Sequence, residues 1–535
     1  MRRGRARARA VAAVERARTA RAAARGDSRR RRGLRIGRRA RRVDARCVPR
    51  RARGRSRRCA AAGVVARAHA RRVDRCVGRR AAPARRGGAR PRVKLRILTV
   101  VHDFLPAHVG GSEIHAAQLS SELVRRGHEV RVATTERDTA RPEGSLRRYN
   151  HGELPVAEVS HWREYADVLD AHREPLHAEV LRCLLREWKP DLVHFQHCAF
   201  FGARALEVAR EEGVPATATL HDYHLLCDRA TLLRADGSIC ERGSRAWASA
   251  EDACSDCLQR HPRHPARTGA AARERGLDAA LAEVALERRA LAARVLAAMP
   301  RLISPSQFLA DRFVEAGLLR REQIALASCG FPGPRRDARR SDPQVPLRVG
   351  YVGGIYPSKG VHVLVDALRL LRGAPIELSV HGVLEWFPDY VAQLRAAAEG
   401  CAVHFAGRFD PLELDRVLEP LDVLVVPSVW YENMPLSIWE AWRLSIPVVA
   451  SDLGGMREAL AGGGGVLVPP GDARALADSL RALAADRERL HELARAHPRV
   501  PDLSEAAARI EGVYREVLER SSAANLTRSA GSGAP

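Results

Sequence analysis

Two carboxylates with seven residues between them, Glu432 and Glu440, mark the stretch of this chain with the clearest chemistry. Ionised carboxylates only accept hydrogen bonds, which suits them to bind the hydroxyl groups of a ligand. The backbone amides between them lie where a helix is expected to begin, and helix N-termini favour anions such as a diphosphate. The residues of this loop are Asn433, Met434, Pro435 and Leu436. The stretch therefore predicts a site for a ligand with both hydroxyl and phosphate groups.

Buried strands must hold this loop in place. Residues 421–426 and 446–450 are short, branched apolar runs, and a helix is expected from Pro435 between them. The same alternation of strand and helix runs through residues 95–330 and starts again at residue 347. It predicts an α/β fold of two Rossmann-like, doubly wound domains that face each other across a cleft, with ligands at the carboxyl ends of the strands.

Further residues with suitable chemistry follow strands of the first half. Gly110 and Gly111 join the first predicted strand to its helix, where glycines let the backbone approach a phosphate closely. An ordinary turn between a strand and a helix fits these glycines equally well. His221 ends another predicted strand, where a structural pair with Asp222 is the alternative to contact with a ligand.

The second half has its own candidates. Gly353 and Gly354 form a predicted turn after the strand at 347–353, and Lys359 follows where a helix begins. A lysine at that point can neutralise a diphosphate as a point charge, and the chain has only three lysines against 87 arginines. Arg408 follows the strand predicted at 402–406.

Together these motifs resemble the GT4 family of retaining glycosyltransferases, also described as glycosyl transferase group 1, whose members have the GT-B fold. The resemblance rests on the spaced glutamate pair, the loop from Pro106 to Glu113, the Lys359–Gly360 segment and the Gly454–Glu458 segment. It covers roughly residues 95–520. Two positions depart from the pattern. Pro106 is spaced one residue more widely from the glycines, and Gly354 stands where the family usually has an arginine. Either the diphosphate has one cation fewer, or another residue such as Arg408 or Arg229 compensates.

The resemblance implies that the chain is a hexosyltransferase that moves a sugar from a UDP- or GDP-sugar to an acceptor with retention, without a cofactor for catalysis. Glu432, His221 and Lys359 would be catalytic. Donor binding would use Gly110, Gly111, Gly353, Gly354, Lys359, Arg408, Glu432, Asn433, Met434, Pro435, Leu436 and Glu440. The alternatives are a nucleotide-sugar epimerase or phosphorylase of the same fold, and a non-catalytic polyanion-binding protein.

The net charge of +27 is concentrated at the N-terminus. Residues 1–90 hold 34 arginines, no lysine and four acidic residues, so the rest of the chain is nearly neutral and a specific nucleic-acid partner is not expected. The composition predicts that residues 1–93 are a disordered, arginine-rich extension. A polyanion-binding arm and an upstream extension without selected structure both fit, and we favour the second.

We predict an N-terminal, acceptor-side domain at 94–330 with an insertion at 222–270, a linker at 331–346 and a nucleotide-sugar-binding domain at 347–500. A C-terminal helix at 501–520 and a disordered tail at 521–535 complete the prediction. No signal peptide and no uncharged run of membrane-spanning length stands in the sequence, which predicts a cytoplasmic protein. The protein could also contact the inner face of the membrane, and a role in the synthesis of cell-envelope polysaccharide fits. The acceptor could be a sugar, a lipid-linked molecule or a small molecule.

Four of the eleven cysteines lie in the insertion: Cys227, Cys240, Cys254 and Cys257. The last two form a C-x2-C pair, the spacing at which two thiolates bind one zinc ion. The first two spacings are looser. A structural zinc site and a loop of reduced cysteines both fit the pattern.

Overall fold

The computed structural model describes residues 94–163, 165, 168–234, 236–241, 254, 257 and 277–531. The predicted N-terminal extension and most of the predicted insertion lie outside the described residues. Across the described ranges, every helix is too short or too polar to cross a membrane.

The first lobe is built on a six-stranded sheet with the order β3-β4-β2-β1-β5-β6. Its strands are β1 (Arg96–Val100), β2 (Glu129–Glu136), β3 (Leu146–His151), β4 (Leu154–Ser160), β5 (Leu192–Phe195) and β6 (Ala216–Ala218). All neighbouring pairs are parallel except β3 and β4. The central strand β1 is almost wholly buried, as a strand covered on both faces must be.

Helices and a short strand pair surround this sheet. They are α2 (Gly111–Arg125), α3 (Val168–Arg173), α4 (Pro175–Trp188), α5 (Arg204–Glu211), α8 (Leu277–Ala297), α9 (Gln307–Glu315), β7 (Leu302–Ser304) and β8 (Ile324–Leu326). Local sequence explains where two of them begin. Pro175 occupies the first turn of α4, and the Ser306 side chain caps α9 by accepting from the Leu309 amide.

The second lobe has a parallel sheet with the order β11-β10-β9-β12-β13-β14. Its strands are β9 (Leu347–Val352), β10 (Ile376–His381), β11 (Val403–Gly407), β12 (Val423–Val426), β13 (Val448–Ser451) and β14 (Gly465–Val468). The helices are α10 (Val361–Leu370), α11 (Pro388–Ala397), α12 (Leu414–Leu418), α13 (Leu436–Arg443), α14 (Gly454–Leu460), α15 (Ala473–Ala485) and α16 (Arg487–Arg495). The strand order reverses between β9 and β12, so the loops after these two strands border a crevice.

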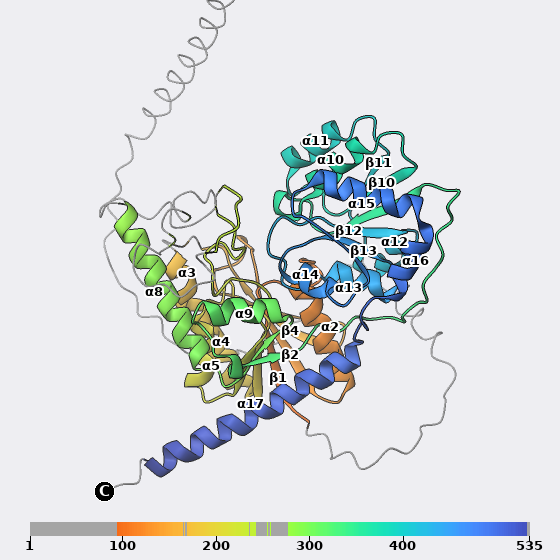
Figure 1. Cartoon of the computed structure of the whole chain (residues 1–535). Helices are drawn as coiled ribbons and strands as arrows, with labels where there is room; N and C mark the ends of the chain where they lie inside the picture. The colour runs from red at the N-terminus through yellow and green to blue at the C-terminus, as the bar shows by residue number, and fades with distance from the viewer. Residues whose placement is uncertain are drawn as a thin grey trace, which may run out of the picture. The chain divides into compact units, whose positions relative to one another are not determined.

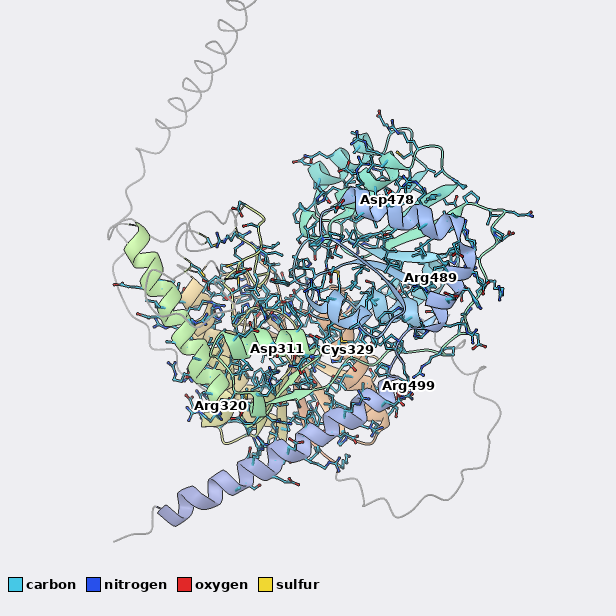
Figure 2. The ribbon with its side chains drawn as sticks, viewed as in Figure 1. Asp311, Arg320, Cys329, Asp478, Arg489 and Arg499 are labelled. Carbon is cyan, nitrogen blue, oxygen red and sulfur yellow. The ribbon has the colours of Figure 1, made fainter. Side chains whose placement is uncertain are left out.

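The connection between the two sheets packs on the second lobe. Cys329, labelled in Figure 2, lies just beyond β8, and its side chain is in one apolar cluster with Phe331 and Trp442. Burial raises the pKa of the Cys329 thiol to about 12, so this thiol is a packing residue at neutral pH.

The last helix, α17 (Leu503–Gly531), returns to the first lobe, where it runs beside α2 (Figure 1). Val517 packs in the same core as Ile97 of β1. The Tyr514 hydroxyl lies 2.7 Å from His194 Nδ1, and Arg126 Nε donates to Glu511 at 2.6 Å. Residues 521–531, predicted as disordered, instead continue this helix, since they contain no proline and several good helix formers.

The sequence analysis missed the hairpin of β3 and β4. These strands form the outer edge of the first sheet, and they meet at Gly152, whose φ of 58° suits a tight turn. β3 is mostly exposed, and three of its six residues are charged or histidine, so it lacks the apolar run by which the other strands were recognised.

Candidate active site

Glu432 lies in the loop between β12 and α13, and its carboxylate has three partners inside the protein. The residue is buried, and its Oε1 accepts hydrogen bonds from Lys359 Nζ at 2.7 Å, Ser428 Oγ at 2.7 Å and Trp430 Nε1 at 2.8 Å. These bonds fix the direction of the side chain. All of them use Oε1, so Oε2 keeps its capacity to accept from a further donor.

Lys359 is brought to Glu432 by the glycine that follows it. Gly360 has a φ of 71°, and a Cβ at this position would lie 1.9 Å from the carbonyl oxygen of Pro427. Only glycine satisfies both conditions. The amide of Val429 donates to the carbonyl of Ser358 at 2.9 Å, which ties the loop after β9 to the loop after β12.

The ammonium group of Lys359 is held as a charge in a partly apolar setting. Burial is the largest single effect and opposes the charge, but the Glu432 carboxylate and Tyr356 together outweigh it, so the pKa of Lys359 lies above its ordinary value. The ammonium nitrogen also lies 5.2 Å from the ring centroid of Trp430 and 5.8 Å from that of Tyr356. This arrangement keeps one cation at the crevice between β9 and β12.

The amides of the predicted anion site are available. Within the described part of the chain, the backbone N–H groups of Asn433, Met434 and Leu436 donate to no other residue. Leu436 opens α13, so these groups lie at or just before a helix N-terminus. Pro435, which precedes the helix, carries no N–H.

The loop of the second lobe contacts the first lobe directly. Asn433 Nδ2 donates to the carbonyl of His221 at 2.9 Å, and the Tyr223 hydroxyl donates to the carbonyl of Tyr431 at 3.2 Å. A Cβ added to Gly111 would lie 3.2 Å from Leu436 Cδ1. The structure thus brings predicted donor-binding residues of both lobes together.

A second contact between the lobes uses a helix N-terminus. Glu458 of α14 accepts hydrogen bonds from the backbone amides of Gln307 at 2.8 Å and Phe308 at 2.6 Å, the first residues of α9. A carboxylate satisfies the amides that a helix leaves unpaired at its start. Glu458 therefore has an architectural role.

The loop with Gly110 and Gly111 is covered by the side chain of Glu113. Glu113 is buried, its Oε1 lies 3.1 Å from His102 Nε2, and its Oε2 would lie 2.3 Å from a Cβ on Gly110. The glycine at 110 therefore makes room for this carboxylate. Burial lowers the pKa of His102 well below its ordinary value, with the charge on His197 as the next cause.

His221 lies at the carboxyl edge of the first sheet as a neutral imidazole. Its Nε2 donates to Gln196 Oε1 at 2.8 Å, which leaves the lone pair on Nδ1. Burial lowers the pKa of His221 well below its ordinary value, and the neighbouring His115 and His197 lower it further. Asp222, the expected structural partner of His221, lies instead 3.1 Å from His197 Nε2.

Glu440 is the second carboxylate of the predicted pair. Glu440 is half-buried on α13, and its charge interacts with Arg443 and Asp415. Burial raises the pKa of Glu440 to about 7; Arg443 opposes this shift and Asp415 adds to it.

The remaining predicted donor residues have different surroundings. A Cβ on Gly354 would lie 2.4 Å from the ring of Tyr356, so a larger residue here would require this ring to move. Gly353 begins the same turn, and its amide donates to the carbonyl of His381. Arg408 is exposed at the end of β11. Arg229 has Nε and Nη1 buried without a hydrogen-bond partner among the described residues.

The four cysteines of the insertion lie near one another. Cys227 and Cys240 are buried, and burial is the first cause that raises the pKa of Cys254, with Asp228 and then the thiols of Cys227, Cys240 and Cys257 adding to the shift. Among the described residues, no three of these thiols lie within 4.8 Å of one another. Whether they bind zinc stays a prediction.

Two partners of Glu432, Ser428 and Trp430, were missed in the sequence. Both lie between the end of β12 and Glu432, within four residues of it. A hydroxyl and an indole N–H ahead of a predicted carboxylate are the signal that would have found them.

Two family models match this chain. "Glycosyltransferase Family 4" matches residues 109–332 and "Glycosyl transferases group 1" matches residues 346–486, which correspond to the two lobes. The glycogen synthase of Mycobacterium tuberculosis is 24% identical over 423 residues, which cover 75% of this chain and 89% of that protein.

Solved structures show the same fold. Sucrose-phosphate synthase from Thermosynechococcus elongatus superposes with a TM-score of 0.56 and 20% identity, covering 80% of this chain and 100% of that one. Anabaena Alr3699/HepE in complex with UDP and glucose has a TM-score of 0.52 and 18% identity, covering 79% of this chain and 99% of that one. The fold predicted from the sequence is therefore confirmed as GT-B, and the chain belongs to the GT4 glycosyltransferases, with a glycosyl transferase group 1 domain as its second lobe.

Proposed function

We propose that this glycosyltransferase transfers a hexose from a nucleotide diphosphate sugar to an acceptor with retention at the anomeric carbon. The observation that carries the proposal is the pairing of Lys359 with Glu432 beside the unpaired amides of α13. A cation and helix-terminal amides suit a diphosphate, and a carboxylate with a spare oxygen suits a sugar hydroxyl. The bound UDP and glucose of the Anabaena protein support the same ligand class.

The ion pair indicates how the site would respond to its donor. Lys359 Nζ would turn from Glu432 to the diphosphate, where its charge stabilises the leaving group. Glu432 would stay in place, because Ser428 and Trp430 still donate to it. Its released acceptor capacity would then go to the hydroxyl groups of the sugar.

The first lobe would supply the other face of the site. The neutral ring of His221 can accept a hydrogen bond from a sugar hydroxyl at Nδ1, and its carbonyl is fixed by Asn433. Gly110 and Gly111 would approach the diphosphate. For retention, we propose attack on the same face as the departing diphosphate, whose oxygen accepts the proton of the acceptor hydroxyl.

The test uses the full chain with UDP-, GDP- and ADP-hexoses, with and without oligosaccharide and lipid-linked acceptors. We expect acceptor-dependent release of a nucleoside diphosphate, and NMR of the product should show the anomeric configuration of the donor. Conversion of the donor sugar without any acceptor would instead indicate an epimerase. An inverted product would contradict retention.

A further inference from the structure

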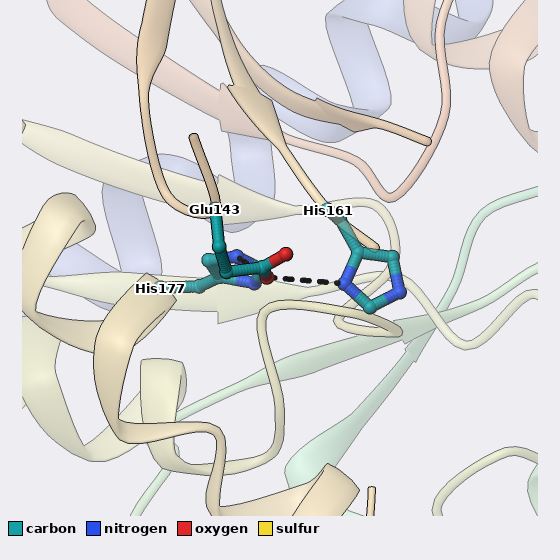
Figure 3. Close-up of side chains that lie close together, drawn as sticks. All are labelled: Glu143, His161 and His177. Carbon is teal, nitrogen blue, oxygen red and sulfur yellow. Dashed lines mark ion pairs between the residues drawn. The ribbon is translucent and has the colours of Figure 1, made fainter. Parts of the chain in front are cut away.

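Three side chains from separate segments converge at the outer edge of the first sheet (Figure 3). Glu143 lies before β3, His161 follows β4 directly, and His177 is in the first turn of α4. Glu143 Oε1 lies 3.1 Å from His177 Nε2 and 3.7 Å from His161 Nδ1. Each of the three atoms lies within 4.8 Å of the other two.

These three atoms are buried, and none makes a hydrogen bond with a described residue. The exposed fraction of the side chain is 0% for His177, 9% for His161 and 14% for Glu143. A buried polar atom without a partner costs about 1–3 kcal/mol. Glu143 Oε1 is within ion-pair distance of both ring nitrogens, but no proton is shared between them in a hydrogen bond. Three such atoms that face one another indicate a bound ligand that all three share.

The opposite ends of two of the side chains are held by hydrogen bonds. Glu143 Oε2 accepts from the amides of Trp162 at 2.7 Å and Arg163 at 2.9 Å. His177 Nδ1 donates to the carbonyl of Phe200 at 2.6 Å, which leaves the lone pair on Nε2. A histidine that binds a metal is oriented in this way, with its other nitrogen donating to a carbonyl.

The spacing of the atoms fits a small transition-metal ion. Zinc binds nitrogen and carboxylate oxygen at about 2.0–2.2 Å, so the ligand atoms of a tetrahedral site lie about 3.4 Å apart. The two measured separations, 3.1 Å and 3.7 Å, bracket that value. A direct hydrogen bond would need the Nε2–H of His177 to point at Glu143 Oε1, and the geometry does not provide one.

We propose that Glu143, His161 and His177 bind one Zn²⁺ ion, with a water or an exogenous ligand in the fourth position. The ion would join the segment before β3 and the end of β4 to α4. It lies beyond the proposed donor site and does not depend on that proposal.

The site is linked to the carboxyl edge of the sheet through Phe200. The ring of Phe200 lies 4.4 Å from that of His161 and 6.3 Å from that of His102, and its carbonyl holds His177. Binding of the ion therefore fixes both the ring and the backbone of Phe200. We expect this to order the first-lobe side of the proposed active site.

The test is zinc binding by the full chain after removal of metal with a chelator. Zinc content and affinity are measured at pH 7 for the wild type and for Glu143→Gln and His161→Gln, with Glu153→Gln in the exposed turn of the same hairpin as the matched control. We expect each ligand variant to lose one equivalent of high-affinity zinc. The dissociation constant for zinc at this site should rise by more than about 100-fold, because even the loss of a residue that only supports a ligand can weaken metal binding by up to that factor. Glu153→Gln should bind as the wild type does.

Cobalt substitution separates this site from the four cysteines of the insertion. Thiolate ligands give cobalt an intense near-ultraviolet charge-transfer band, and Glu143→Gln should leave this band unchanged. The visible absorption of cobalt bound by nitrogen and oxygen should be lost in the same variant. Circular dichroism checks that the variants are folded, and two different variants guard against a folding defect in one. Equal zinc stoichiometry and affinity in the wild type and both ligand variants would overturn the proposal. Zinc binding by the wild type through its thiols alone would also overturn it. In either case water would occupy the site between Glu143, His161 and His177.

Discussion

Glu440→Gln should make the protein more stable, and more so at high pH. The folded protein raises the pKa of this carboxyl from 4.5 to about 7, because burial disfavours its charge. Because the folded state binds this proton more tightly than the unfolded state, protonation of Glu440 stabilises the fold. This contribution to the free energy of unfolding is complete below pH 4.5, the pKa in the unfolded state, and is lost as the pH rises through about 7, the pKa in the folded state. Glutamine does not titrate, so the variant escapes this loss.

The size of the effect follows from the two pKa values. Ionisation of Glu440 costs the folded state about 1 kcal/mol at pH 5 and about 3 kcal/mol at pH 8, from 1.36 kcal/mol per unit. The stability of the variant relative to the wild type should therefore increase by about 2–2.5 kcal/mol between these two pH values. Arg443 and Asp415, the charged neighbours, remain in both proteins.

The assay is urea unfolding at pH 5 and pH 8, followed by tryptophan fluorescence. Glu377→Gln, at an exposed position of β10 in the same lobe, is the control and should show no pH-dependent gain. If the difference between Glu440→Gln and wild type is the same at both pH values, the fold does not raise the pKa of Glu440 and the reasoning fails. The gain in stability should accompany weaker donor binding, as is common for residues strained for function.

Three further predictions concern the charged pair of the site, the glycine beside it and the contact of α17 with the first lobe. Lys359→Ala and Glu432→Ala should each lower kcat by about 100-fold or more while thermal unfolding shows a folded protein, and Lys94→Ala, at an exposed lysine, should keep wild-type turnover. Gly360→Ala should lower the free energy of unfolding by several kcal/mol in urea unfolding, because its Cβ meets the Pro427 carbonyl. Gly373→Ala is the control: Gly373 has a φ of 82° and open space around it, so the variant should cost only about 1–2 kcal/mol. Equal costs for the two variants would contradict the close approach at Gly360. Tyr514→Phe should cost about 1 kcal/mol, because buried His194 loses one hydrogen bond and keeps Thr219 and Gln196 as partners. Tyr149→Phe, which loses only a 3.4 Å contact, should be nearly neutral by the same measurement.

The second lobe was the more predictable part of the fold. Its strands are continuous apolar runs, such as Val423–Val426, and its helices begin at recognisable residues, such as Asp472 before α15. The family pattern then placed Lys359 and Glu432, which the structure brings within 2.7 Å of each other. The close approach of Lys359 to Glu432 depends on Gly360, which directly follows Lys359 in the sequence motif.

Other features depend on contacts that no local pattern carries. The raised pKa of Glu440 results from its burial on α13, which the spacing of the two glutamates does not reveal. Glu143, His161 and His177 come together only because the β3–β4 hairpin folds back on α4, and the hairpin was missed. A turn at Gly152 between two extended runs was the available signal.

The central claim is that a nucleoside diphosphate group binds between Lys359 and the start of α13. Its most direct test is titration calorimetry of the full chain with UDP, GDP and ADP, for the wild type and for Lys359→Ala. We expect one of these nucleotides to bind the wild type with one-to-one stoichiometry, and the variant to bind it about 10- to 100-fold more weakly, the worth of a charged hydrogen bond. Equal affinity for the wild type and the variant, or no binding of any of the three nucleotides, would contradict the claim.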